Sequence, residues 1–281
     1  MAKVLMFHRI LPEKLIAKPN AYSTFGTLIS QEYFEDVLSC VLGNGFRFST
    51  ISALTDQVNN DNNIALTFDD GYSDNFEFAL PVLQKFNATA TFFPVVNPCK
   101  NKTVLPLDIY YQCIDEMELS DKKRHDFISG DTKNKFYWSE PERQKQFLKT
   151  RFEKLPTQNR VSYLQSEQIK FLSDKGFEIG SHSVTHSLFT AEYMNESKIN
   201  FELQQSKSYL EGIIGKPVSS FCFPSGYYNR RAIELAKGAG YTSVCLINRN
   251  NNEEAHALSS FERIFVKPDS IEELLSELKS K

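Results

Sequence analysis

The sequence predicts an α/β fold in which mostly parallel strands form a closed or nearly closed barrel. Short apolar runs rich in β-branched and aromatic residues alternate with longer segments of helical periodicity, which is typical of βα units around a parallel sheet. The chain shows seven or eight such cycles, and this repetition favours a barrel. Its 281 residues can bury a full core, and we expect a single domain over residues 1–281.

Strands are expected where these apolar runs are bounded by polar or glycine-containing segments. In chain order the expected strands are Val4–Phe7, Phe46–Ser49, Ile64–Phe68, Thr89–Val95, Phe177–Gly180, Val218–Phe223, Thr242–Ile247 and Ile264–Val266.

Helices are expected between these strands because capping residues mark their ends. Three helices are predicted from a capping residue and a terminating glycine, namely Ser30 with Gly45, Ser166 with Gly176 and Asn229 with Gly240. The segment 196–214 places apolar side chains on one face and stops at Gly215. Ser270 and Glu273 form a capping box that predicts a last helix.

The segment from about 97 to 162 interrupts this alternation and is predicted to be a largely helical insertion. It is rich in charged residues and holds the single tryptophan, Trp138, beside Phe136 and Tyr137. Two interpretations stay open. The aromatic side chains can pack a structural flap onto the barrel wall, or they can recognise substrate, because functional loops gather at the catalytic rim of such scaffolds.

Composition excludes several classes of partner. A net charge of −3 gives no general attraction to nucleic acid, and no apolar stretch is long enough to span a membrane. The apolar stretch before His8 has only four residues, too few for a secretory signal, and the five cysteines include no Cys-x-x-Cys pair. We therefore expect a cytoplasmic protein with reduced thiols, of unknown oligomeric state.

Two polar clusters follow predicted strands and are candidates for a metal site. Asp69 and Asp70 come directly after one strand, and His182 and His186 follow another. One carboxylate of an adjacent pair can bind a metal while the other acts as a base, and two imidazoles four residues apart can reach one ion from a single helical turn. Each cluster also has an ordinary interpretation, as a turn after a strand or as two surface histidines.

Four motifs in order resemble those of a known family: Thr67-Phe68-Asp69-Asp70-Gly71-Tyr72, Ala90-Thr91-Phe92-Phe93, Glu178-Ile179-Gly180-Ser181-His182-x-x-x-His186 and Phe221-Cys222-Phe223-Pro224-Ser225-Gly226. They are similar to successive motifs of the polysaccharide deacetylases, the NodB-homology enzymes of carbohydrate esterase family four. The resemblance spans nearly the whole chain apart from the insertion. It implies a distorted (β/α)7-type barrel and metal-dependent removal of N-acetyl groups from amino sugars.

The resemblance also implies roles for individual residues. Asp69 takes the place of the general base, while Asp70, His182 and His186 take the places of the metal ligands. The ion is expected to be a single divalent metal, zinc first, with cobalt and nickel as alternatives, because all three accept two imidazoles and a carboxylate. Such a site can activate water and polarise an amide.

The proton donor to the leaving amine is expected to be His8. In many relatives a histidine near the C-terminus has this role, but nothing after His256 fits that motif. The sequence around His8 resembles the N-terminal Tyr-His motif of a rearranged subgroup in which that histidine is the general acid. The alternative is a solvent-exposed or structural histidine.

The last motif departs from the family's Arg-x-Pro-Tyr form. Cys222 stands where the arginine is expected, and Ser225 follows Pro224 where the tyrosine is expected. The tyrosine offers its backbone N–H to the oxyanion, so the resemblance implies that Ser225 can keep this role. Arg263 is a candidate substitute for the missing arginine that holds the base, and a surface salt bridge is the alternative. Cys222 is expected to be a packed residue and not a nucleophile.

The expected function is therefore a metal-dependent amidase that removes an N-acetyl group from an amino sugar or oligosaccharide, such as a nucleotide- or lipid-linked sugar in surface-polysaccharide synthesis. A deformylase or a cyclic-amide hydrolase could use the same residues. A non-catalytic carbohydrate-binding protein on the same barrel is the alternative from another class.

Overall fold

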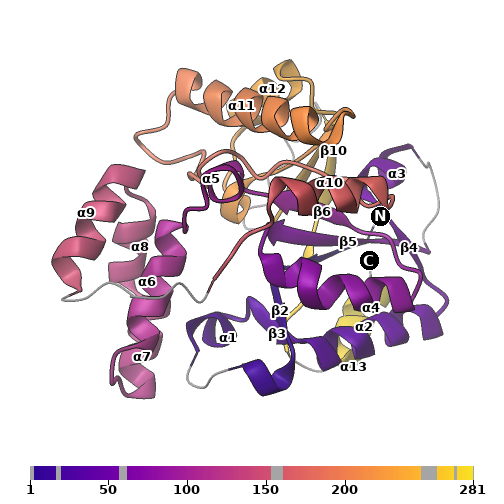
Figure 1. The fold of residues 1–281 in the computed structure, drawn as a ribbon, viewed down its shortest axis with the longest axis horizontal. Coiled ribbons are helices and arrows are strands. Elements are labelled where there is room, and N and C mark those ends of the chain that lie inside the picture. The colour runs from indigo at the N-terminus through magenta and orange to yellow at the C-terminus, as the bar shows by residue number, and fades with distance from the viewer. Residues whose placement is uncertain are drawn as a thin grey trace.

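The fold is an assembly of parallel strands surrounded by helices (Figure 1). The structure is a computed structural model, and it describes residues 3–16, 20–56, 62–152, 161–247, 258–268 and 271–280. The strands are β1 (Lys3–Phe7), β2 (Arg9–Leu11), β3 (Leu28–Ser30), β4 (Arg47–Ser49), β5 (Asn63–Asp70), β6 (Thr91–Pro94), β7 (Glu178–Ile179), β8 (Ser220–Cys222), β9 (Ser243–Leu246), β10 (Ser259–Glu262) and β11 (Ile264–Phe265).

The strands form a distorted and discontinuous barrel. One sheet runs β11-β1-β5-β6-β7, with β4 also paired to β5, and a second runs β10-β9-β8. A single bridge between Ser181 and Phe221 joins the two sheets beyond β7. Since Arg263 alone separates β10 from β11, the sequence of pairings returns to β1. All the named strand pairs are parallel, as the alternating pattern predicts.

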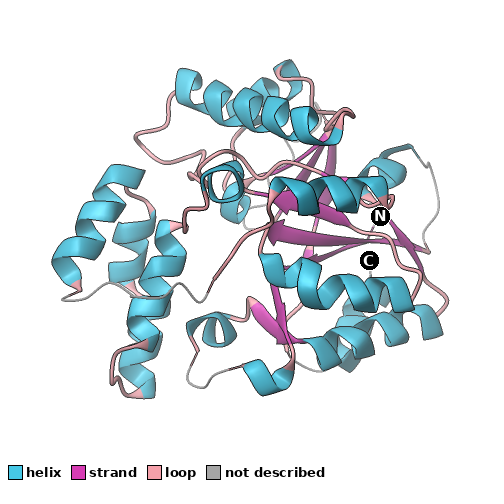
Figure 2. Cartoon of the chain, viewed as in Figure 1, coloured by secondary structure: helices cyan, strands magenta, loops and turns pink. Residues whose placement is uncertain are grey.

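Helices cover the outside of the strands (Figure 2). They are η1 (Glu13–Leu15), α1 (Ala21–Phe25), α2 (Gln31–Gly43), α3 (Ile51–Asp56), the π-helical η2 (Asn75–Ala79), α4 (Leu80–Lys85), α5 (Val96–Asn101), α6 (Pro106–Asp115), α7 (Asp121–Ser129), α8 (Asp131–Tyr137), α9 (Pro141–Arg151), α10 (Ser166–Asp174), α11 (Glu196–Ile214), η3 (Pro224–Gly226), α12 (Arg230–Gly238) and α13 (Ile271–Ser280). None of the described helices is long and apolar enough to cross a membrane.

The core is built around β5, in which all eight residues are buried. A strand with both faces covered reads as a continuous apolar run, and this is why Ile64–Phe68 was recognisable. Phe68 stacks between Phe7 of β1 and Phe92 of β6, with ring centroids 5.4 and 4.9 Å apart. Packing of this kind fixes β5 rigidly, so the polar residues at its carboxyl end are held in place.

Most predicted helix ends agree with the structure, with one correction. The Ser30 hydroxyl accepts from Tyr33 N–H and the Asn229 side chain accepts from Ala232 N–H, as expected of caps. The cap predicted at Ser166 is wrong, because Gln165 caps α10 through a reciprocal pair with Gln168. Ser270 of the predicted capping box lies outside the described residues.

The predicted insertion is helical, and in Figure 1 helices α6 to α9 lie together beside the strands. Asp108 of α6 attaches this helical group to the barrel. Its buried carboxylate accepts hydrogen bonds from Tyr22 at 2.7 Å, from Tyr72 at 2.9 Å and from Tyr163. Tyr72 lies just after β5 in sequence, so the insertion is joined to the barrel next to the candidate site.

Candidate metal and catalytic site

Two neighbouring carboxylates end strand β5. The strand was expected to stop at Phe68, but it continues through Asp69 and Asp70, which are both buried. Asp70 has a φ of 67° and Gly71 one of 75°, so the chain turns sharply here. A Cβ on Gly71 would lie 2.8 Å from the backbone of Pro94, so glycine is required both for its conformation and for the close approach to β6.

The two histidines lie in a loop after β7 and not on a helical turn, which corrects the expectation from their spacing. Ser183 and His186 both have positive φ, of 71° and 61°, and this loop geometry brings residues four apart to the same side. Glu202 of α11 holds the loop: its carboxylate accepts from the N–H groups of Val184 and Thr185 at 2.8 and 2.9 Å.

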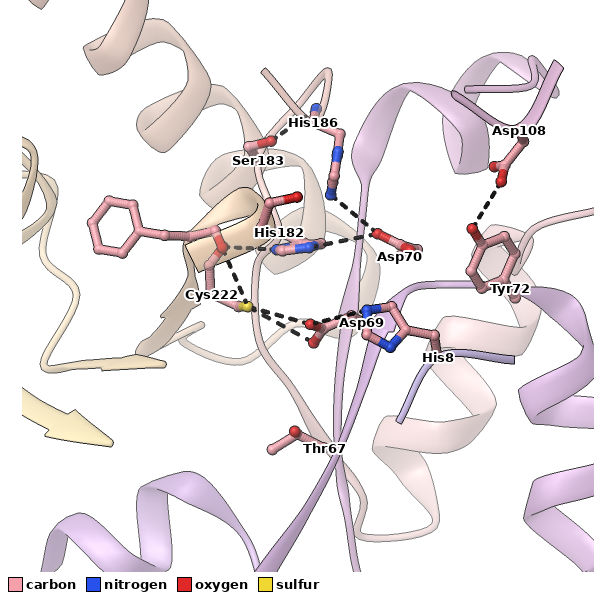
Figure 3. A network of polar contacts seen from close by, with 12 residues as sticks. His8, Thr67, Asp69, Asp70, Tyr72, Asp108, His182, Ser183, His186 and Cys222 are labelled. Carbon is pink, nitrogen blue, oxygen red and sulfur yellow. Dashed lines mark hydrogen bonds and ion pairs between the residues drawn. The ribbon is translucent and has the colours of Figure 1, made fainter. Parts of the chain in front are cut away.

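Asp70, His182 and His186 converge as Figure 3 shows. The Nε2 atoms of His182 and His186 lie 3.5 and 3.3 Å from the same oxygen, Oδ1 of Asp70. His182 Nδ1 donates to the carbonyl of Cys222 at 2.7 Å, so in the neutral ring its Nε2 carries a lone pair. Burial lowers the pKa of both imidazoles, and this favours the neutral rings.

This arrangement fits a divalent cation. Asp70 Oδ1 is buried and has no hydrogen-bond partner among the described residues. Burial, and the charge of Asp69 beside it, raise the pKa of the Asp70 carboxyl, so an added positive charge would stabilise its ionised form. Two ring nitrogens with lone pairs and one carboxylate oxygen are a ligand set suited to zinc that leaves coordination positions open.

A second set of groups, Asp69, His182 and Cys222, also lies close enough to bind one ion. It is the poorer site for two reasons. Both oxygens of Asp69 are already bonded to Arg263, and burial raises the pKa of the Cys222 thiol well above its ordinary value, whereas a metal binds the thiolate.

Asp69 is held by a buried arginine. Arg263 Nη1 and Nη2 donate to its two oxygens at 2.7 and 2.8 Å, and the side chains are only 1% and 3% exposed, so the surface salt bridge considered for Arg263 is wrong. Arg263 also reaches Thr67 Oγ1 at 3.2 Å and Cys222 Sγ at 3.0 Å. Burial alone would raise the pKa of Asp69, but Arg263, together with His182 and His8, holds the pKa of this carboxyl well below its ordinary range.

His8 lies beside the Asp69 carboxylate. Its Nε2 is 3.9 Å from Asp69 Oδ2, and the side chain is 16% exposed. Burial lowers its pKa to about 4, although the charge of Asp69 acts in the opposite direction. Asn75 donates to the backbone carbonyl of His8 at 2.7 Å. The imidazole predicted to be an acid is therefore next to the predicted base.

Ser225 and Pro224 lie in the short helix η3 at the same rim. Ser225 has a φ of 53°, and its hydroxyl is hydrogen-bonded to the phenol of Tyr137, which comes from α8 of the insertion. The Tyr137 oxygen is also 3.4 Å from Nδ1 of His186. Pro224 begins the turn that brings Ser225 to this position.

Several polar residues near the site carried no clear functional signal in the sequence. Tyr137 was noted only as an aromatic residue in the insertion, and Asp108 carried no recognisable signal. Arg9 and Asp74 form a buried ion pair with an N–O distance of 2.8 Å. The position of Arg9 directly after His8 in the sequence is the one clue that could have suggested this pair.

A small chamber of about 60 Å³ lies over Asp69, Asp70 and the histidines, and it shares Tyr137 and Ser225 with an adjoining cavity of about 280 Å³. Trp138 and Tyr227 line the larger cavity, with their rings in edge contact at 4.6 Å. A third cavity, of about 380 Å³, lies between α9 and α11 and is lined by neither aspartate and neither histidine of the site.

Comparison with known proteins agrees with this architecture. Residues 56–244 match the family described as polysaccharide deacetylase. YxkH of Bacillus subtilis (strain 168), whose name refers to the same family, is 19% identical over 243 residues. That match covers 85% of this chain and 61% of YxkH, so the chain spans less than two thirds of that relative.

Two solved structures share the fold over almost their whole length. The Streptococcus pyogenes deacetylase PplD, in complex with acetate, has a TM-score of 0.68 at 19% identity. The alignment covers 99% of this chain and 97% of the PplD chain. IcaB from Ammonifex degensii has a TM-score of 0.66 at 18% identity with the same coverage. Since the family match extends over well over half of the sequence, the chain belongs to the polysaccharide deacetylase family.

Proposed function

We propose that this protein is a metal-dependent N-deacetylase of an amino-sugar substrate. The observation that carries the proposal is the convergence of two imidazole Nε2 atoms on Oδ1 of Asp70, which makes no hydrogen bond within the described part of the chain. When bound there, zinc, cobalt or nickel would act as a Lewis acid on the amide and would lower the pKa of water. Asp70, His182 and His186 are the residues that would hold the ion.

Asp69 is proposed to be the general base. Arg263 keeps the carboxylate ionised and, through two parallel hydrogen bonds, fixes its plane, so it is the residue that orients the base. A base must lie within reach of the water that attacks the acyl carbon, and Asp69 borders the same small chamber as the proposed metal ligands.

His8 is proposed to pass a proton to the leaving amine. With a pKa of about 4 it is neutral at neutral pH, so it must first gain that proton. Asp69 lies 3.9 Å away, and its pKa is held well below its ordinary range, so a protonated Asp69 would release the proton toward the imidazole. A movement of about 1 Å brings the two groups to hydrogen-bond distance. The backbone N–H of Ser225, preceded by Pro224, is proposed to face the developing oxyanion.

The cavity supports a small substrate. A volume of about 280 Å³ is close to the lower end of the range for small-ligand sites. Walls formed by Trp138 and Tyr227 suit the apolar face of a pyranose ring. We therefore propose a single amino-sugar unit, such as a nucleotide- or lipid-linked sugar in surface-polysaccharide synthesis.

The proposal is tested by measuring acetate release from UDP-N-acetylglucosamine and from N-acetylated chito-oligosaccharides. Wild-type protein is reconstituted with zinc, cobalt or nickel and compared with Asp69→Asn, which should still bind metal. Acetate release by the wild type and its loss in Asp69→Asn would support the proposal. Formate release from N-formyl analogues without acetate release would indicate a deformylase, and saturable sugar binding without turnover would indicate a binding protein.

A further inference from the structure

Helix α8 of the insertion reaches the candidate metal site through Tyr137, and Leu107 and Tyr111 of α6 line the same small chamber. Tyr137 is the last residue of α8 and is only 8% exposed, and it lines both the small chamber and the adjoining cavity. Lys133, one turn earlier on the same helix, places its ammonium 4.6 Å from the centre of the Tyr137 ring. The phenol is therefore held in place beside His186 and Ser225.

The two histidines of the site require partners of the same kind. A histidine that binds a metal through one ring nitrogen almost always donates its other ring N–H to a fixed acceptor, which sets the tautomer and the orientation of the ring. His182 has such an acceptor in the carbonyl of Cys222, at 2.7 Å. For His186 the atom in this place is the phenol oxygen of Tyr137, 3.4 Å from Nδ1.

The direction of the hydrogen bonds follows from the geometry. His186 presents Nε2 to Asp70 at 3.3 Å, so a neutral ring that uses this lone pair for a cation carries its hydrogen on Nδ1. The Nδ1–H then donates to the Tyr137 oxygen, and the phenol donates its own hydrogen to Ser225 Oγ. A phenol can accept and donate at the same time, so both contacts are satisfied.

We propose that Tyr137 is a positioning residue that orients His186 for the metal ion, so that the insertion is part of the metal site. This inference rests on the proposed function, because it assigns a role toward the ion that the function requires. It gives α8 a role beyond the two interpretations of the insertion, a structural flap or substrate recognition, because α8 supplies the partner of a proposed metal ligand.

The test compares zinc affinity in Tyr137→Phe and Tyr111→Phe. Both variants lose only a hydroxyl, and the Tyr111 hydroxyl, on α6 of the same insertion, is buried without a hydrogen-bond partner among the described residues. Zinc dissociation constants are measured by competition with a chromophoric chelator, and urea unfolding of the metal-free proteins shows whether the fold is kept. The visible spectrum of the cobalt-loaded forms reports the ligand geometry directly.

We expect Tyr137→Phe to bind zinc about 10- to 100-fold more weakly than wild type, which is the usual effect of removing such a partner, and to change the cobalt spectrum. Tyr111→Phe should match wild type in both. Equal zinc affinity in wild type and Tyr137→Phe, or equal losses in the two variants, would overturn the inference and leave the proposed function intact. A wild-type protein that binds no zinc, cobalt or nickel would overturn the proposed function, and the inference with it.

Discussion

Replacing Arg263 by methionine should both destabilise the protein and change the ionisation of Asp69. The guanidinium makes two short bonds to the carboxylate, and both side chains are almost completely buried. Removing one partner of a buried ion pair leaves an uncompensated charge and costs about 3–5 kcal/mol. The variant also loses the donors to Thr67 and Cys222, so we expect a loss at the upper end of this range.

The same substitution should raise the pKa of Asp69. Burial raises this pKa, and the charge of Arg263 is the largest influence that lowers it, so removing the arginine leaves the effect of burial less opposed. The pKa of Asp69 is lower in the folded protein than in the unfolded chain. Asp69 therefore contributes to stability above its unfolded pKa, and this contribution is lost as pH falls through its folded pKa. In Arg263→Met this acid-dependent part of the stability should disappear, and the acid limb of the kcat/KM profile should move to higher pH.

The assay is urea unfolding of metal-free protein, with the pH dependence of kcat/KM measured on the metal-loaded form. The matched control is Arg231→Met, which removes an exposed arginine paired to Glu196 at 2.7 Å. Exposed ion pairs contribute little, so the control should stay close to wild type. A loss below about 1 kcal/mol in Arg263→Met, with an unmoved acid limb, would refute the assignment of Arg263 as the residue that holds the base.

Three further outcomes follow from the structure. Because the pKa of His8 is about 4 in the folded chain against 6.5 in the unfolded one, the unfolded state binds the proton first as pH falls. The free energy of unfolding of the metal-free protein should therefore fall by up to about 3 kcal/mol as pH is lowered between these values. In His8→Gln, the free energy of unfolding measured in urea should depend less steeply on pH. The same pH dependence in His8→Gln and wild type would contradict this. Gly71→Ala should lower stability by about 1–3 kcal/mol in thermal unfolding, because Gly71 has a positive φ and an added Cβ would meet Pro94. The loss should exceed that of Gly45→Ala, because Gly45 also has a positive φ but an added Cβ there would meet no other atom. Glu202→Ala removes the acceptor of the N–H donors in the histidine loop, and each unsatisfied donor should cost about 1–3 kcal/mol of stability. Titration with zinc should therefore show weaker binding. A wild-type zinc affinity would show that the loop holds its shape without this carboxylate.

The sequence predicted the elements of the barrel better than the contacts between distant segments. The strands were recognisable because a strand buried on both faces is a continuous apolar run, and β5 is such a strand. The strands β2, β3 and β10 were missed, and in β10 Phe261 is the single apolar residue. The four motifs were sufficient to predict that Asp70, His182 and His186 lie together.

Spacing and local residue type were insufficient elsewhere. A separation of four residues suits a helical turn, but the loop between His182 and His186 achieves the same convergence with positive φ angles. Arg263 had two interpretations because sequence does not reveal burial, and here burial decides between them. Tyr137 reaches Ser225 across 88 positions of the chain, and no local pattern records a contact of that length.

The metal content of purified wild-type protein, measured by elemental analysis after dialysis beside the His182→Ala/His186→Ala double variant, tests the central claim most directly. The site predicts about one divalent ion per wild-type chain and none in the double variant. A wild-type protein that holds no ion after reconstitution with zinc, cobalt or nickel would contradict it.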